Sequence, residues 1–522
     1  MADGAQPLGI WLRLSAGGAA ALVAALIALP LAAVLARAGG IAALGPADWA
    51  ALRFTLLQAT LSAAVSLALA IPAARALARR QFPGRGLLIT LLGAPFILPV
   101  VVAVMGLLAI FGRAGIVNDV LASFGFGRIS IYGLGGVVLA HVFFNLPFAV
   151  RLLLQGWLAI PSERFRLAAA LGFGPAEVAR HLELPMLKAL APGIFATVFL
   201  LCLTSFASAL ILGGGPRATT LEVAIYQAFR FDFDLARATA LASLQLALCA
   251  ATALAASRFT VPSIFGAGLD RPVARWDSRS APLRILDSGI IGAAALFLLA
   301  PVAMVILAGV PRVAALPVPV WQAAGRSLLV AAASTAVTLA LTLPMALAVA
   351  RSARAHALET VGMLPLTASA LVTGTGLFLL LNPIAGPAAL ALPVTIAVNA
   401  AMALPFALRS LIPAARDLEA GYGRLAESLG MTGFARLRLL TLPRLRRPLG
   451  FAAGLTAALS MGDLGVIALF ADSDRATLPL EIYRLMGAYR MADAAGAAVL
   501  LLALSLSAFW LLDRGGRADA GT

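Results

Sequence analysis

Long apolar stretches alternate with short polar segments along the whole chain of 522 residues. A helix of roughly 20 mostly apolar residues crosses a hydrocarbon core of about 30 Å, and only a helix or a closed barrel satisfies backbone hydrogen bonds in lipid. Segments of this length predict an all-α polytopic membrane protein with about twelve transmembrane helices. They lie near residues 14–36, 54–74, 87–111, 132–156, 193–213, 237–257, 286–309, 328–350, 360–381, 389–411, 450–470 and 494–513.

The composition agrees with a membrane protein and explains its positive charge. Hydrophobic residues make up 61% of the chain and charged residues 12%, and the mean hydropathy is +0.98, whereas soluble domains are roughly half apolar and one quarter charged. The net charge is +16. With the N-terminus inside, most Lys and Arg residues fall in cytoplasmic segments, where such residues are retained. We therefore expect both termini in the cytoplasm and no nucleic-acid partner.

One stretch of twenty residues occurs twice. RLAAALGFGPAEVARHLELP covers Arg166 to Pro185, and RLAESLGMTGFARLRLLTLP covers Arg424 to Pro443, with nine identical positions. Each copy lies between the fourth and fifth spans of a set of six. Because six spans return the chain to its starting side, the two halves are expected to be parallel repeats, related by an axis along the membrane normal.

The repeat divides the chain into two halves. Residues 1–257 form the first half, with a cytoplasmic loop at 161–192, and residues 286–522 form the second, with a cytoplasmic loop at 413–448. A polar segment at 258–285 is the expected cytoplasmic linker. An amphipathic loop can simply lie at the lipid headgroups. Two copies at equivalent positions instead favour a shared role.

Each loop is predicted to form two short helices that meet at a glycine. In the first copy Ser162 can cap one helix, Gly172 can end it in the left-handed conformation, and Pro175 can start the next. Pro185 is expected to stop that second helix. The corresponding residues of the second copy are Gly430, Thr432 and Pro443.

The spacing inside the repeat resembles a known motif. The motif consists of a glycine, nine residues, an aliphatic residue, any residue and then Leu-Pro. It occurs from Gly172 to Pro185 and again from Gly430 to Pro443. This is similar to the cytoplasmic loop of the membrane subunits of ATP-binding cassette (ABC) importers, although its Glu-Ala-Ala triplet here begins with Arg166 and Arg424. That departure resembles the branch with two fused halves, which includes ferric-iron and thiamine permeases. The resemblance implies the type I ABC importer permease fold.

In that family each loop docks on one cytoplasmic ATPase monomer. The resemblance therefore implies two copies of an ABC ATPase subunit as partners, and a coupling role for residues of both loops. These residues are Arg166, Ala168, Gly172, Pro175, Glu177 and Pro185 in the first loop, and Arg424, Ala426, Gly430, Phe434 and Pro443 in the second.

The segments that follow the loops resemble thiamine permeases within this branch. They run from Leu212 to Ala242 and from Met461 to Ala495, and they form a weak repeat of their own. The resemblance implies import of thiamine and its phosphates across the inner membrane by alternating access. It also implies a periplasmic thiamine-binding protein, which would dock near the acidic outside segments at about 213–235 and 471–493. Solvated loops with short interfacial helices are the alternative for these segments.

The sequence provides no P-loop for ATP hydrolysis. That motif needs Gly-Lys followed by Ser or Thr, and the single lysine, Lys188, follows Leu187. Energy is therefore expected from a partner, and the chain is predicted to be a transport subunit, not an enzyme, with no cofactor. Cys202 and Cys249 fall inside predicted spans, which gives no support for a disulfide or a metal site.

Polar residues inside the spans are candidates for the substrate pathway, because they are costly there. Asp463 is the foremost, since it follows Gly462 at the position equivalent to Ser205. Its carboxylate can attract the thiazolium cation of thiamine, or it can bond backbone amides at a helix break. Asn145 and Asn399 precede prolines and are expected to bond between helices at kinks. Similar interhelix bonds are expected of Gln58, His141 and Gln245.

Two other functions fit parts of the pattern. A ferric-iron importer shares the branch with fused halves. A secondary transporter driven by an ion gradient also fits twelve spans, but it needs coupling carboxylates at the centre of the membrane. Asp463 is the one clear candidate for such a carboxylate. That class gives no reason for the paired loops.

Overall fold

Helices account for the regular secondary structure in the part of the chain that the structure describes. This computed structural model describes residues 10–37, 44–93, 97–215, 218–256, 258–259, 280–352, 356–471 and 473–517. Among these residues, eleven helices are long and apolar enough to span a membrane. A pair of shorter helices, Ala357–Thr367 and Ala370–Leu381, bent by 93°, adds a twelfth if it counts as one span. The predicted all-α polytopic fold is confirmed.

In the first half, the third and fifth spans are broken. The predicted fifth span, 193–213, is wrong at its start and in its continuity, because its helix runs from Leu184 to Leu203 and a short helix follows a break. The helices are α1 (Ile10–Arg37), α2 (Pro46–Arg79), α3 (Arg85–Leu91), α4 (Val100–Phe111), α5 (Ile116–Ser123), α6 (Leu134–Leu158), α7 (Ser162–Ala170), α8 (Pro175–Val178), α9 (Leu184–Leu203), α10 (Ala207–Leu212), α11 (Leu221–Arg230) and α12 (Leu235–Ala256).

The second half repeats this order, except that its described residues form no helix equivalent to α5 or α7. Its fifth span is broken at the equivalent place, Gly462–Leu464. The helices are α13 (Ala281–Gly309), α14 (Val318–Arg351), α15 (His356–Met363), α16 (Ala370–Leu381), α17 (Pro387–Ser428), α18 (Gly433–Arg436), α19 (Leu442–Met461), α20 (Gly465–Phe470), α21 (Leu478–Gly487) and α22 (Met491–Arg517). Of the predicted linker at 258–285, residues 260–279 lie outside the described residues.

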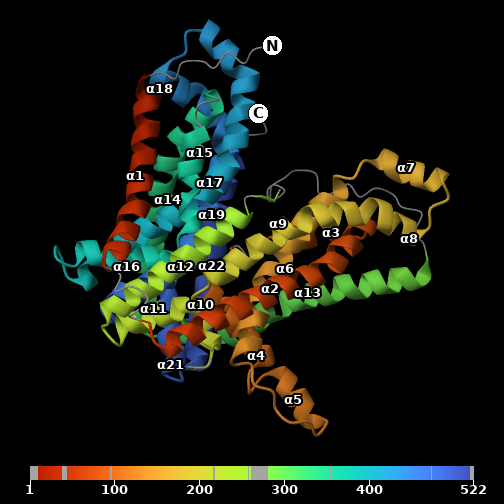
Figure 1. Cartoon of the computed structure of the whole chain (residues 1–522), viewed down its shortest axis with the longest axis horizontal. Coiled ribbons are helices and arrows are strands. Elements are labelled where there is room, and N and C mark those ends of the chain that lie inside the picture. Colours follow the sequence, from red (N-terminus) through yellow and green to blue (C-terminus); the bar gives the residue numbers. More distant parts are fainter. Residues whose placement is uncertain are drawn as a thin grey trace.

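The repeated loops lie at separate ends of the molecule. Helices α2, α6, α9 and α13 run toward α7 and α8, whereas α1, α14, α17 and α19 run toward α18 (Figure 1). Helices α10, α11 and α21 lie where these two groups of helices come together. A movement of either loop can therefore act on its own group of helices.

The first span of each half packs against the other half. Helix α1 contacts α14 and α16, and α13 contacts α2 and α4; Figure 1 shows α13 beside α2 and α1 beside α14. The close contacts repeat as well. A Cβ on Gly106 of α4 would lie 2.3 Å from the Pro301 carbonyl oxygen, and one on Gly376 of α16 would lie 2.2 Å from that of Pro30. Small residues permit such close helix crossings in membranes.

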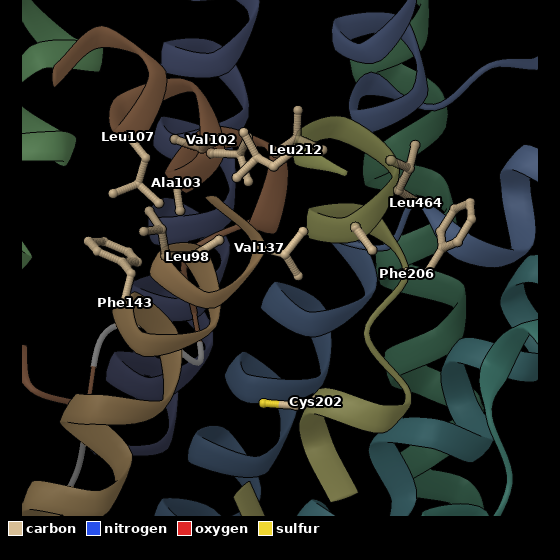
Figure 2. Packing of buried hydrophobic residues seen from close by; sticks show 14 of the residues in the cluster. Leu98, Val102, Ala103, Leu107, Val137, Phe143, Cys202, Phe206, Leu212 and Leu464 are labelled. Atoms are coloured by element: carbon tan, nitrogen blue, oxygen red, sulfur yellow. The ribbon is translucent and has the colours of Figure 1, made fainter. Parts of the chain in front are cut away.

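The largest apolar core joins both halves. In Figure 2, Val102, Ala103 and Leu107 of α4 lie near Val137 and Phe143 of α6. The same cluster continues through α9 and α10 to Leu464 in the break before α20. Since lipid tails are as apolar as these side chains, close packing between helices, not exclusion of water, holds this core together.

Candidate functional site

Both repeated loops contain the same glycine turn. Gly172 has φ +69° and Gly430 has φ +64°, the left-handed conformation in which a glycine meets no steric cost. In the first loop, the N–H of Phe173 donates to the Ala168 carbonyl at 2.9 Å and that of Gly172 donates to the Ala169 carbonyl at 3.1 Å. In the second loop, the N–H of Met431 donates to the Ala426 carbonyl at 2.8 Å and that of Gly430 donates to the Glu427 carbonyl at 2.9 Å. This hydrogen-bond pair is the Schellman motif that ends a helix. The predicted glycine breaks are confirmed in both copies.

The prediction that Pro185 and Pro443 stop a helix is wrong. A π-helical turn at Ala179–Glu183 connects α8 to α9, and one at Leu437–Thr441 connects α18 to α19. Each proline lies in the first turn of the following span. A proline at the start of a helix needs no N–H partner, and the wider turn before it accommodates the ring. Each loop is therefore joined directly to the fifth span of its half.

The helices before the two glycines differ between the copies. Pro175 begins α8, as predicted, but α17 runs unbroken to Ser428, so the second copy has no separate first helix. Ser162 is not a cap: its hydroxyl donates to Glu163 at 3.0 Å. Two hydrogen bonds hold the pKa of the Glu163 carboxyl below its usual value: the larger effect comes from its own backbone N–H, and the smaller from the Ser162 hydroxyl. Thr432 occupies the cap position without a side-chain cap bond.

Large apolar side chains are exposed at equivalent positions of both loops. Leu167 and Leu171 are 61% and 62% exposed in the first loop, and Leu425 and Leu429 are 54% and 67% exposed in the second. The intervening alanines, Ala168 and Ala426, are buried, as is Phe165. Of the other predicted loop residues, Arg166, Glu177, Pro185, Arg424, Phe434 and Pro443 are exposed. Each loop therefore presents two large apolar side chains at its surface.

Buried or partly buried ion pairs tie each loop to the second span of its half. Glu183, which is 2% exposed, pairs with Arg75 of α2 at 2.7 Å. In the second half, Glu419 of α17 pairs with Arg351 of α14 at 2.7 Å and with Arg436 of α18 at 2.6 Å. Breaking such a pair leaves a buried charge without its partner. Each loop is therefore fixed to two spans.

A cavity of about 400 Å³ lies where the halves meet, among residues of α6, α9, α10, α17 and α19 and the breaks in the fifth spans. Its size falls within the range of about 300–1,000 Å³ that is usual for ligand pockets. The residues predicted for the substrate pathway all line it, and they are Asn145, Ser205, Asn399, Gly462 and Asp463. These residues are far apart in the sequence, and the fold brings them to the wall of one cavity.

Asp463 makes the backbone contact that was one of the two alternatives expected of it. Its Oδ1 accepts a hydrogen bond at 3.2 Å from the backbone N–H of Gly465, the first residue of α20 after the break. Its Oδ2 is buried and has no hydrogen-bond partner within the described residues. One oxygen therefore bonds the backbone, and the other makes no such bond.

Glu222 is a cavity residue that the sequence did not reveal. It belongs to α11, which was expected only in an outside segment, yet the side chain is fully buried and lines the cavity. Gln245 of α12 donates to its Oε1 at 3.0 Å, and the Ser369 side chain also interacts with the carboxyl group. Within the described part of the chain, Oε2 has no partner that meets hydrogen-bond geometry. The one signal in the sequence was a carboxylate directly after the repeated Thr-Leu pair of Thr220 and Leu221.

Interhelix hydrogen bonds fix the polar wall, as predicted. His141 lies between Ser62 (3.2 Å) and Ser208 (3.1 Å), and Ser208 contacts Ser205 at 2.6 Å. Asn145 donates to the His141 carbonyl of its own helix at 2.8 Å and, between helices, to the sulfur of Cys202 at 3.4 Å. In the second half, Asn399 donates to Ser460 at 3.0 Å. In the first half, Gln58 donates to the Cys202 carbonyl and Gln245 donates to the Leu203 carbonyl.

The outside segments are packed against the spans at their described residues. The N–H of Leu221 donates to Thr55 at 2.9 Å, and that of Leu478 donates to Ser327 at 2.8 Å. Tyr226 is buried, with Phe206 and Phe231 at ring distances of 5.3 and 5.7 Å. Residues 216, 217 and 472 lie outside the described residues.

Comparison with known proteins gives several similar chains. The chain is 43% identical to the thiamine transport system permease protein of Escherichia coli over 478 residues, which cover 89% of each chain. It is 42% identical to that of Brucella abortus, over 89% of this chain and 87% of the relative, and 34% identical to that of Haemophilus influenzae, over 86% of each. No family model matches the chain.

Proposed function

The chain belongs to the family of thiamine transport system permeases, and on this premise we propose that it is the membrane permease of an ABC importer for thiamine and its phosphates. The observation that carries the proposal is the pair of equivalent loops, each with a glycine turn and two exposed leucines. A transporter that works alone has no need for two such surfaces. A transporter that binds a partner made of two like subunits needs one surface for each subunit.

Each loop is proposed to dock on one copy of a cytoplasmic ABC ATPase. Leu167 and Leu171, and their equivalents Leu425 and Leu429, supply the apolar contacts. Phe434, which is 73% exposed, extends the second surface. Each Å² of apolar surface that is buried on docking would contribute about 25 cal/mol. These side chains would therefore be the main source of the docking free energy. The polar rim of arginines around them would add orientation.

The loops are proposed to face the cytoplasm, with both termini on that side of the inner membrane. The cytoplasmic excess of arginine supports this orientation. Helices α5 and α21 lie on the side of the molecule away from α7 and α18 (Figure 1). That side would face the periplasm, where a thiamine-binding protein would release its ligand near α11 and α21.

Transport is proposed to occur by alternating access. Binding of ATP would draw two ATPase subunits together, and each loop would follow its subunit. Because the loops connect through π-helical turns to α9 and α19, their movement would tilt the two spans that break beside the cavity. Hydrolysis would then return the loops. Such coupling requires that the ATPase bind the two states of the permease with different affinities.

Reconstituted transport tests the proposal. The permease, its ATPase and its binding protein are placed in proteoliposomes, and ATP-dependent uptake of labelled thiamine is measured against ferric iron. We expect thiamine uptake alone. Iron uptake, or thiamine uptake driven by an ion gradient without ATP, would overturn the proposal.

A pair of loop variants tests the docking surface. Leu167→Asp with Leu425→Asp should remove the ATPase from the purified complex. Ala169→Glu is the matched control, because the second loop carries Glu427 at the equivalent position. Retention of the ATPase by the double variant would exclude this surface.

A further inference from the structure

We propose that Glu222 and Asp463 form a site for the positive charge of the transported ligand, one carboxylate from each half. The inference rests on the proposed function and deepens it, because it identifies which residues of the cavity recognise a cation. Both side chains line the same cavity of about 400 Å³, and each keeps one buried oxygen without a hydrogen-bond partner in the described chain.

A buried carboxylate oxygen without a partner is costly. Most buried polar atoms in proteins have a partner, and each exception calls for an explanation. Here two exceptions lie in the walls of one cavity. Gln245 fixes Oε1 of Glu222, and the N–H of Gly465 fixes Oδ1 of Asp463, so each carboxylate is held in place while its second oxygen stays available.

The rest of the wall suits a flat organic cation. No lysine or arginine occurs among the described residues that line the cavity, so no basic side chain there pairs with the two carboxyl groups. The lining includes Phe144, Phe206 and Phe406, and aromatic faces attract cations through the ring quadrupole. Amide and hydroxyl groups of Asn145, Asn399 and Ser205 can bond the polar edge of a ring.

The two carboxylates also depart from the symmetry of the repeat. Thr220 and Leu221 correspond to Thr477 and Leu478, so the residue equivalent to Glu222 is Pro479. The residue equivalent to Asp463 is Ser205. Each half therefore places a single carboxylate where the other half has none, and both converge on one cavity. A role limited to supporting the repeated scaffold does not require this.

The test compares thiamine with a neutral isostere in which thiophene replaces the thiazolium ring. Uptake is measured in proteoliposomes with the binding protein saturated by one ligand or the other, so that its own affinity does not enter. The variants are Glu222→Gln and Asp463→Asn, which keep shape and remove charge. Glu481→Gln on α21 is the control, since Glu481 does not line the cavity.

The wild-type complex should import thiamine faster than the isostere. Removing one partner of a buried charge pair costs about 2 kcal/mol or more, which corresponds to roughly a thirtyfold loss of this preference in either variant. Uptake of the isostere should stay near wild type, which a merely structural defect would not allow. Two variants that keep the preference would overturn the inference while thiamine uptake by wild type upholds the proposed function. Failure of wild type to import thiamine would instead overturn the proposed function.

Discussion

Replacing the turn glycines by valine should uncouple the ATPase from transport. Gly172 and Gly430 both have positive φ, and a Cβ on either would meet nothing within 4 Å. A substitution there acts through the backbone alone. An L-residue in the left-handed conformation costs about 1–2 kcal/mol, and a β-branched residue is a strong outlier there.

The size of the effect follows from that cost. A difference of about 1–2 kcal/mol changes a conformational ratio by a factor of about 5–30. Because the glycine turn sets the direction in which α8 or α18 leaves the preceding helix, Gly172→Val should lower ATP-dependent thiamine uptake by about this factor. The amount of protein in the membrane should not change, since the turn lies outside the spans.

Proteoliposome uptake and ATPase activity provide the assay. Gly172→Asn should retain most uptake, because asparagine tolerates the left-handed conformation. Gly421→Val is the control: Gly421 lies in helical backbone of α17, also with open space around it. Wild-type uptake by Gly172→Val would refute the reasoning. Equal defects in the Val and Asn variants would show that side-chain volume at the docking surface, not backbone strain, is responsible.

Three further predictions concern an ion pair, a close helix crossing and the orientation in the membrane. Glu183→Gln should lower the thermal unfolding temperature of the purified permease more than Glu177→Gln does, because Glu183 is buried against Arg75 whereas Glu177 is exposed; equal temperatures would mean that the ion pair contributes nothing. Gly376→Val should reduce the amount of folded permease on size-exclusion chromatography, because its Cβ would lie 2.2 Å from the Pro30 carbonyl oxygen, and Gly289→Val, with open space, should not. Leu171→Cys and Leu429→Cys should react with a membrane-impermeant thiol reagent only from the cytoplasmic side and Tyr489→Cys only from the periplasmic side; the native Cys202 and Cys249 are buried, and the opposite pattern would reverse the proposed orientation.

Local chemistry explains what the sequence predicted correctly. Hydropathy located the spans because each must satisfy its backbone within lipid. The glycine turns were predictable because a left-handed residue at a helix end favours glycine. Asp463 and Ser205 were linked in advance only because the repeat aligned them, and the structure places both on the wall of one cavity.

Long-range packing explains what it could not predict. The position of Glu222 depends on how α11 folds back between the spans, and the Leu221 bond to Thr55 that anchors it joins residues far apart in the chain. The exchange of α1 and α13 between halves depends on Gly376 and Gly106, whose role is visible only beside Pro30 and Pro301. Each π-helical turn lies directly before a proline that continues the helix where the pattern predicted its end.

Fusion of the two halves gives the cavity a property that two identical subunits could not provide. Around a two-fold axis, identical subunits present identical walls. Here His141 occupies the position of Asn399, and Cys202 that of Ser460, while Asn399 bonds Ser460 and His141 bonds Ser62 and Ser208. Thiamine has no two-fold symmetry, since its cationic ring differs from its pyrimidine ring. A single chain would therefore let each wall fit one end of the ligand, while the equivalent loops would still match the proposed symmetric pair of ATPase subunits.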